Sequence, residues 1–247
     1  MNPVTRHYDD LLAAHYTWMT GSSLLDKAAE QKALLAQLGA GQGHKRLAVD
    51  LGCGPGFQSL ALADFGFVRV LALDTCQTLL TELEAAKGER PIETRLDDLC
   101  SFSTLVANGA ADVIVCMGDT LTHLRSREDM STLFSDIYQA LAPGGRAILT
   151  FRDLSQALHG VDRFIPVQSD ADRIMLCALD FGPDTVTVND LIFVRDGDGW
   201  ALHKSSYQKL RLAPCDVVSE LRRHGFVIDH DTPLGRLHAI AARKPDA

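Results

Sequence analysis

Apolar positions along the chain fall first at helical spacing and then in short strand-like runs. Between Tyr8 and Leu38 they share one helix face, which Gly21 to Ser23 interrupt, and this predicts two helices. Apolar runs then predict strands at 46–51, 68–73, 92–96, 111–117 and 146–151, with helices at 58–65, 77–86 and 130–141. Strands and helices that alternate in this way form a parallel sheet covered on both faces, because right-handed crossovers place the helices there.

The pattern changes after Arg152, where helical crossovers stop. Strand-like segments follow at 163–167, 173–181, 185–195 and 200–212. The tetrapeptide Asp196-Gly197-Asp198-Gly199 predicts a hairpin, since these residues accept the positive φ of a tight turn. We therefore expect an antiparallel β-meander added to the sheet, then a helix at 214–224 and a closing strand pair at 225–228 and 236–243.

These elements predict an α/β fold with a doubly wound, mostly parallel, seven-stranded sheet. A chain of 247 residues, of which 46% are hydrophobic, can fill one such core, so we expect a single domain over 1–247. Its expected parts are N-terminal helices at 1–43, a ligand-binding core at 44–153, a β-meander cap at 154–212, and a closing helix and strands at 213–247.

Composition excludes several classes of function. No apolar run approaches the roughly 18 residues of a membrane helix, and the start, MNPVTRHYDD, lacks a signal-peptide core, so we expect a cytoplasmic protein with no membrane partner. The six cysteines occur without a CxxC pair, which indicates neither a disulfide framework nor a metal site. A net charge of −8 argues against nucleic acid as a partner.

A glycine-rich turn after the first predicted strand carries the most specific signal. The strand ends at Asp50 and Leu51, and Gly52-Cys53-Gly54-Pro55-Gly56 leads into a helix. Dinucleotide-binding proteins use GxGxxG before a pyrophosphate, whereas the spacing here is GxGxG and the preceding acid suits an ammonium group better than phosphates. Asp74 ends the second predicted strand, where a carboxylate can accept both hydroxyls of a ribose.

This stretch resembles motif I of the class I methyltransferases that depend on S-adenosylmethionine (AdoMet), and the resemblance extends over the first 153 residues. It implies a Rossmann-like methyltransferase fold and AdoMet as the cofactor. In that family the acid and the glycine loop hold the methionine part of the cofactor, which implies this role for Asp50, Gly52, Cys53, Gly54 and Gly56.

The same resemblance assigns the other cofactor contacts. Asp74 corresponds to the ribose-binding acid, with Thr75 beside the adenine. The segment that ends in Asp97-Asp98-Leu99 resembles the third-strand motif whose acid contacts the adenine amino group; both aspartates are candidates, and strand alternation favours Asp97. The residues Met117, Gly118 and Asp119 follow the fourth strand and are expected near the sulfonium.

A looser resemblance links Tyr8, Tyr16 and the segment 118–124 to glycine N-methyltransferase and its small-molecule relatives. It implies transfer of a methyl group to nitrogen or oxygen of a small molecule. The meander after Phe151 matches no motif, so the acceptor is not specified. Two other functions stay open: an AdoMet-binding protein without transferase activity, and a nicotinamide-dependent oxidoreductase, which the glycine spacing disfavours.

The candidate residues of the acceptor site come from several segments. His123, with an ordinary pKa of about 6.5, can act as a base or orient the acceptor; the alternative is a helix-start histidine bound by backbone. Tyr8, Tyr16 and Trp18 form either an aromatic lid over the cofactor and the acceptor, in which Tyr16 contacts the cofactor, or part of the core. Arg152 binds either an acceptor carboxylate or a surface carboxylate.

The last candidates lie on the final meander strand. Tyr207, Lys209 and Arg211 alternate with apolar and neutral residues, so period-two geometry places them on one face. We expect this face to line a cavity, with Tyr207 and Arg211 contacting the acceptor; the alternative is a solvated outer face.

Overall fold

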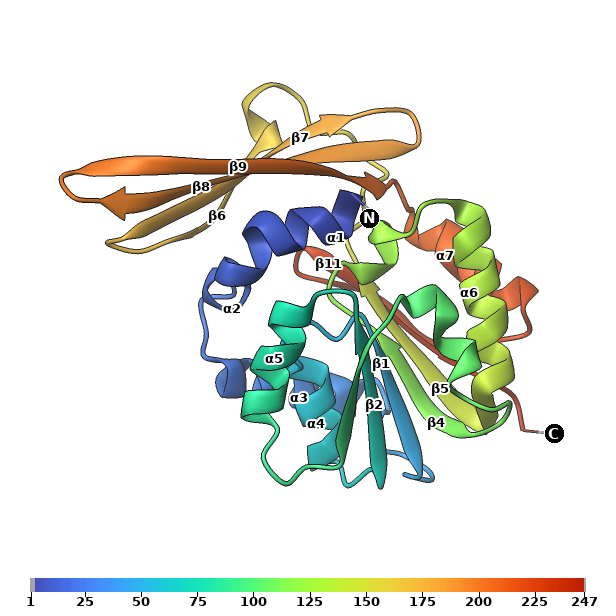
Figure 1. Cartoon of the computed structure of the whole chain (residues 1–247). Helices are drawn as coiled ribbons and strands as arrows, with labels where there is room; N and C mark the ends of the chain where they lie inside the picture. Colours follow the sequence, from blue (N-terminus) through green and yellow to red (C-terminus); the bar gives the residue numbers. More distant parts are fainter. Residues whose placement is uncertain (1–2, 247) are drawn as a thin grey trace.

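The core of the molecule is a seven-stranded sheet, seen in a computed structural model that describes residues 3–246 (Figure 1). Its strand order is β10-β11-β5-β4-β1-β2-β3, and all neighbours among β1 to β5 are parallel, whereas β10 and β11 are antiparallel. The strands are β1 (Leu47–Leu51), β2 (Arg69–Asp74), β3 (Ile92–Leu96), β4 (Ala111–Cys116), β5 (Leu141–Phe151), β10 (Val227–Leu234) and β11 (Leu237–Arg243). The predicted doubly wound, mostly parallel sheet is confirmed.

Helices cover both faces of this sheet. They are α3 (Leu24–Gln37), α4 (Phe57–Asp64), α5 (Gln77–Ala86), α6 (Arg127–Ala140) and α7 (Pro214–Arg223), with short 3₁₀ turns η3 (Leu99–Thr104), η4 (Thr120–His123) and η5 (Gly160–Arg163). Leu35, Leu60 and Leu83 from α3, α4 and α5 pack on one face, while Phe134 and Val217 from α6 and α7 pack on the other. Burial of apolar surface on both sides stabilises the layered structure.

The N-terminal segment lies between the core sheet and the second sheet (Figure 1). It consists of α1 (Pro3–His7), a π-helical turn η1 (Tyr8–Leu12), a 3₁₀ turn η2 (Ala13–His15) and α2 (Tyr16–Met19), so the first predicted helix is divided. Side-chain contacts attach this segment to both the core and the second sheet. Thr17 Oγ1 donates to Glu82 of α5 at 2.6 Å, and His7 Nε2 lies 2.9 Å from Asp190 Oδ2 of the second sheet.

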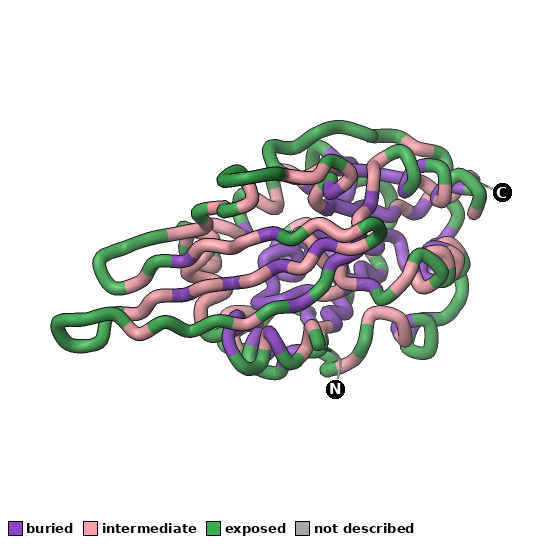
Figure 2. The backbone as a smooth tube through the Cα atoms, turned by 90° about the horizontal axis from the view of Figure 1, so that it is seen from above, coloured by how far each residue is buried: buried purple, intermediate pink, exposed green. Residues whose placement is uncertain are grey.

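The second sheet is the predicted meander. Its strands β6 (Phe164–Ser169), β7 (Arg173–Phe181), β8 (Thr185–Asp196) and β9 (Gly199–Leu210) are antiparallel neighbours in that order. Gly197, at φ 56°, makes the predicted hairpin. We call this sheet the cap. It is separate from the core sheet, which corrects the expectation that it extends that sheet, because β11 already pairs with β5 at the edge. Its hairpins project from the body and are largely exposed (Figure 2).

Two further details differ from or extend the sequence pattern. β5 begins at Leu141, so that Gly144 and Gly145 lie inside the strand and not in a turn before it, and its pairing with β4 shifts register between Ala111 and Val113. Within residues 3–246, no helix is both long and apolar enough to cross a membrane.

Gly56 generates a prediction about stability. It is the N-cap of α4 at φ 93°, and a Cβ there would overlap the Leu83 side chain of α5, whereas Gly66, at φ 88°, has open space around it. We expect Gly66→Ala to lose about 1–2 kcal/mol from the unfavourable φ alone. Gly56→Ala should lose about 1–3 kcal/mol more because the core is overpacked. Urea unfolding measures both, and equal losses would show that α4 and α5 separate without cost.

Candidate functional site

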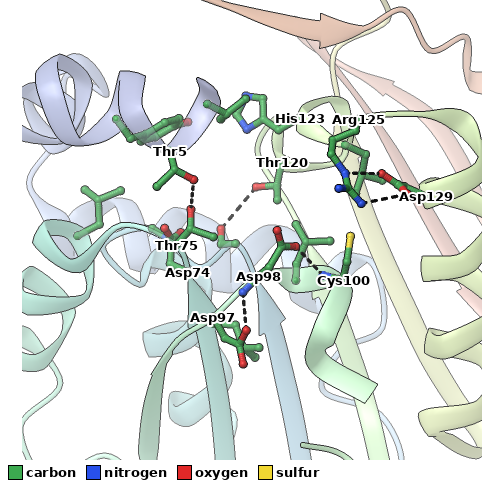
Figure 3. A pocket seen from close by; sticks show the side chains of 18 of the residues that line it. Thr5, Asp74, Thr75, Asp97, Asp98, Cys100, Thr120, His123, Arg125 and Asp129 are labelled. Atoms are coloured by element: carbon green, nitrogen blue, oxygen red, sulfur yellow. Dashed lines mark hydrogen bonds and ion pairs between the residues drawn. The ribbon is translucent and has the colours of Figure 1, made fainter. Parts of the chain in front are cut away.

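A cavity opens at the carboxyl ends of the parallel strands, beneath the N-terminal segment (Figure 3). Open α/β sheets bind ligands in this position. It encloses about 780 Å³ of empty space, part of it open to solvent. Its lining residues are Val4, Thr5, Tyr8, Tyr16, Gly52, Gly54, Leu73, Asp74, Thr75, Leu79, Asp97, Asp98, Leu99, Cys100, Thr120, His123, Leu124, Arg125 and Asp129. We call it the strand-end cavity.

The glycine loop presents backbone to this cavity. Gly54 has φ 55°, and a Cβ added to it would meet only the Tyr16 ring, 3.6 Å away, so a ligand can approach the main chain closely. A Cβ on Gly52 would overlap Thr120, whose hydroxyl donates to the carbonyl of Met117 at 3.0 Å. Gly52 is therefore required for the loop to pack against η4.

Asp74 is the carboxylate that the loop holds in the cavity. Its Oδ2 accepts the Gly54 N–H and its Oδ1 accepts the Cys76 N–H, both at 2.8 Å. Burial raises the pKa of Asp74, and these backbone donors oppose that rise. A carboxylate has about four acceptor positions, so Asp74 retains capacity for donors from a ligand.

The turn after β3 supplies two further acids. Asp97 Oδ1 accepts from the Asp98 N–H at 2.8 Å and from Ser101 Oγ at 2.6 Å, and Asp98 Oδ1 caps η3 through the Cys100 N–H at 2.9 Å. Both acids line the cavity with Leu99, opposite Thr120 (Figure 3). The Oδ2 of Asp97 is not engaged by a hydrogen bond within residues 3–246, whereas the Asp98 carboxylate also accepts from the Cys100 thiol.

Asp50 lies behind this lining. Its side chain points to α4, where Ser59 Oγ donates to Oδ2 at 2.6 Å, and burial raises its pKa to about 7. Asp50 does not line the cavity, because its carboxylate lies under the glycine loop; its contact with the methionine part of a cofactor stays a prediction. Cys53, Gly56, Met117 and Gly118 also lie outside the lining.

Asp119 lies in a saturated ion cluster. Its Oδ1 accepts from the Arg152 N–H and from Thr122 Oγ1, both at 3.1 Å, and its Oδ2 accepts from Arg152 Nε at 3.1 Å and from Lys209 Nζ of the cap. Burial tends to raise the pKa of Asp119, but Lys209 and Arg152 outweigh it and hold that pKa well below its ordinary value. Asp119 and Arg152 therefore bind each other in this structure, and their contacts with a cofactor and an acceptor stay predictions.

His123 lies in an aromatic cluster at the upper wall of the cavity. The Tyr8 and Tyr207 rings face it edge-on, with centroids at 5.9 and 5.5 Å, and its buried Nε2 has no hydrogen-bond partner in the described part of the chain. Burial, helped by the Lys209 cation, lowers the pKa of His123 to about 3. The imidazole is therefore neutral at physiological pH, and the backbone partner proposed as an alternative is not seen at Nε2.

A second cavity shares this wall. It is lined by Pro3, Val4, His123, Leu124, Arg125, Thr185, Thr187, Ser206, Tyr207, Gln208, Lys209 and Leu210. His123, Leu124, Arg125 and Val4 also line the strand-end cavity. We call the second one the cap cavity, because β8 and β9 form most of it.

Two predicted acceptor residues lie elsewhere. Trp18 Nε1 donates to Asp170 at 2.6 Å, and Arg173 stacks 4.4 Å from the ring centroid, so Trp18 packs on the cap. Arg211 follows the end of β9, and its guanidinium donates to the carbonyl oxygens of Leu154, Ser155 and Gly182 at 3.0, 2.6 and 2.7 Å. These tertiary contacts, which strand alternation does not encode, take both side chains away from either cavity; their contacts with the acceptor stay predictions.

The structure also adds lining residues that the sequence pattern missed. Thr5 Oγ1 donates to Thr75 Oγ1 at 3.3 Å and closes the roof (Figure 3); no local signal marks it, because its partner is distant in sequence. Thr120 could have been found from the sequence, because it follows Gly118 shortly after the end of β4. Arg125 pairs with Asp129 at 2.9 Å at the rim.

Part of the chain matches a known family model and is similar to curated proteins. Residues 48–145, from β1 into β5, match the family model of a methyltransferase domain. The chain is 31% identical over 140 residues to the cypemycin N-terminal methyltransferase of a Streptomyces species, covering 52% of this chain and 56% of that protein. It is 30% identical over 115 residues to glycine/sarcosine N-methyltransferase of Halorhodospira halochloris, covering 46% and 43%. The chain thus spans about half the length of these curated relatives.

The fold also matches solved structures. An S-adenosylmethionine-dependent methyltransferase of Clostridium acetobutylicum superimposes with a TM-score of 0.75 at 17% identity, over 96% of this chain and 99% of that one. At this identity the likeness shows the fold. The residues matched to a methyltransferase domain lie within this fold.

The ion cluster predicts a large effect of a single substitution. Asp119→Asn should destabilise the protein by about 3–5 kcal/mol, because it leaves Lys209, whose side chain is 9% exposed, without its counter-charge. Asp64→Asn, in an exposed pair with Arg90, should cost less than about 1 kcal/mol. Denaturant unfolding at neutral pH measures both.

The effect of pH on the stability of the Asp119→Asn variant follows from the lowered pKa of Asp119 in the wild type. Because folding lowers the pKa of Asp119, its contribution is complete above the unfolded value of 3.8 and is lost as the pH falls below it. The stability gap between wild type and Asp119→Asn should therefore narrow in acid. A gap that stays constant down to the acid transition would show that the carboxylate charge is not the stabilising feature.

Proposed function

We propose that this chain, which carries a methyltransferase domain over residues 48–145, transfers the methyl group of AdoMet to an amine nitrogen of a small acceptor. The observation that carries the proposal is the strand-end cavity, in which Gly54 backbone and the Asp74 carboxylate meet. Asp74 has acceptor capacity for both ribose hydroxyls, and Gly52 and Gly54 leave room beside the main chain for the methionine part.

The remaining lining fits the adenine end. Asp97 keeps one carboxylate oxygen for an amino group, Asp98 adds a second carboxylate beside it, and Leu99 gives an apolar surface. The cavity wall is also acidic, with Asp74 nearby, which suits a ligand that bears a sulfonium and an ammonium group. These residues fit AdoMet better than a dinucleotide, whose phosphates would meet the same acids.

The cap cavity supports an amine acceptor. None of its described lining residues is an acid, and the nearby Asp119 is saturated by Arg152 and Lys209. An ammonium ion would find no counter-charge there, so the acceptor enters as the free base. One matched relative is named a glycine/sarcosine N-methyltransferase, in agreement with this choice.

AdoMet, when bound, supplies a methyl group on a positively charged sulfur. With AdoMet held by Asp74 and the glycine loop, the lone pair of the acceptor nitrogen would form the new N–C bond, the S–C bond would break with its electron pair left on sulfur, and the surplus amine proton would leave to water. In this proposal the buried His123 Nε2, which has no partner in the described residues, accepts a hydrogen bond from the amine and thereby orients the lone pair. Alignment of this kind can supply about 7–11 kcal/mol of the barrier, while Tyr8 and Tyr207 exclude water.

The direct test is incubation of the purified protein with labelled AdoMet and fractionated metabolite and peptide extracts, with products identified by mass. We expect labelled products that carry the methyl group on nitrogen. Tight AdoMet binding with no labelled amine product would instead support a binding protein without transferase activity.

The first prediction for this function concerns Asp74. Asp74→Ala should weaken AdoMet binding by about 1–3 kcal/mol, because the ribose hydroxyls lose a charged acceptor. Titration calorimetry measures the dissociation constant, and Asp64→Ala, outside the cavity lining, serves as the control. Unchanged affinity in Asp74→Ala would remove this carboxylate from the cofactor site.

The second prediction concerns pH. Since the pKa of His123 is lowered to about 3, this residue stays neutral between about pH 5 and 9. We expect kcat/KM to rise with pH up to the pKa of the acceptor amine, where the free base predominates, and the midpoint to move with the amine used. His123→Ala should lower kcat/KM at every pH without shifting that midpoint. A midpoint near 6.5 common to all amines and abolished in His123→Ala would make His123 a general base.

A further inference from the structure

The cap cavity contains the open edge of a β-sheet. β9 is the last strand of the cap and pairs only with β8. The residues 206–210 of β9 all line the cavity. Because successive side chains of a strand point to opposite faces, a cavity lined by consecutive residues lies along the strand's edge and not over one face.

The register shows which backbone groups face this edge. The Arg211 N–H donates to the Asp184 carbonyl at 2.9 Å, next to the pair Thr185 and Leu210. Hydrogen-bonded and non-hydrogen-bonded pairs alternate in an antiparallel ladder, so the odd-numbered residues of β9 bond to β8. Ser206 and Gln208 therefore direct their N–H and C=O groups away from β8, and residues 3–246 supply no hydrogen-bond partner for them.

This edge lies across the cap cavity from the wall shared with the strand-end cavity. That wall is formed by His123, Leu124 and Arg125, with Pro3 at the start of α1 beside it. A ligand that hydrogen-bonds to the backbone of Ser206 and Gln208 therefore lies next to the imidazole that faces the cofactor site. The complementary ligand has N–H and C=O groups at strand spacing.

We propose that the acceptor is an extended peptide that adds a strand to β9 at residues 206–208 and presents its free amino terminus at His123. This inference rests on the proposed function and names its substrate class. The absence of acids from the described cap-cavity lining favours an α-amino group, whose pKa of about 7.7–8.0 leaves a large free-base fraction near neutral pH, over a lysine side chain at about 10.4. The similarity to a protein named an N-terminal methyltransferase agrees with this choice.

A second copy of the chain is a less suitable occupant of the edge. Outside the cavity β9 exposes His203 and Lys204, and a charged lysine on an edge strand opposes pairing with another sheet. Inside the cavity the edge faces the α1 and η4 wall. Such a slot suits a single strand better than a whole sheet.

The test removes one outward N–H at a time. Gln208→Pro deletes an N–H that the ladder with β8 does not use, so the edge strand tolerates it, and Lys204→Pro makes the same change at an outward position outside the cavity lining. Tetraalanine with a free amino terminus is titrated into each variant saturated with S-adenosylhomocysteine. We expect about tenfold weaker tetraalanine binding in Gln208→Pro, the value of one backbone hydrogen bond, and wild-type binding in Lys204→Pro. The affinity for S-adenosylhomocysteine should be the same in all three proteins.

Methyl transfer and assembly state complete the test. A library of free-amino tetrapeptides should be methylated at the terminus and its N-acetylated counterpart should not. If amino acids or amino sugars are methylated while no tetrapeptide binds, this inference fails and the proposed function stands. If AdoMet itself does not bind, the proposed function fails. If sedimentation shows a dimer that Gln208→Pro dissociates, the edge is a subunit interface and the peptide proposal is overturned.

Discussion

The pairing of Asp119 with Lys209 and Arg152 is the interaction on which the arrangement of both cavities depends. A buried carboxylate is tolerated only when its charge and its acceptor positions are satisfied. Asp119 obtains this from Arg152, which follows β5, and from Lys209 of β9. Because Asp119 is the N-cap of η4 and Lys209 belongs to the cap, this pairing joins the cap to the core. His123 and Tyr207, which come from those two elements, then meet at 5.5 Å.

Features encoded locally could be predicted from the sequence. The alternation of apolar runs and helices gave the core strands, since burial on both faces forces a continuous apolar pattern. The cap strands and the hairpin at Gly197 followed from period-two alternation and turn chemistry. The glycine loop and Asp74 were also predicted, because a loop that approaches a ligand closely requires particular residues at fixed spacing. The structure places Gly52, Gly54, Asp74, Asp97 and Asp98 around one cavity.

The features that could not be predicted depend on partners distant in the chain. Nothing around Asp119 indicates that Lys209, 90 residues later, satisfies its charge. Arg211 donates hydrogen bonds to loop carbonyl oxygens and Trp18 donates one to Asp170, although the local sequence pattern of each predicted a place in a cavity wall. Asp50 is turned beneath the glycine loop by Ser59, a rotation that a motif does not specify. The separation of the cap from the core sheet likewise follows from β11, which reaches β5 from the end of the chain.

The distribution of charge across the shared wall gives the proposed reaction a direction. The strand-end cavity has Asp74, Asp97 and Asp98 on the cofactor side, whereas the described lining of the cap cavity has no acid, and the wall between them carries a neutral imidazole. A positively charged cofactor is stabilised on the acidic side. Methyl transfer removes the sulfonium charge from that side and creates a charged amine on the side without acids, so each cavity binds its product less well than its reactant. Loss of the amine proton to water then removes the remaining charge. The same electrostatic asymmetry that admits a cationic cofactor and an uncharged amine therefore favours release of both products, without a titratable group of the protein changing its charge.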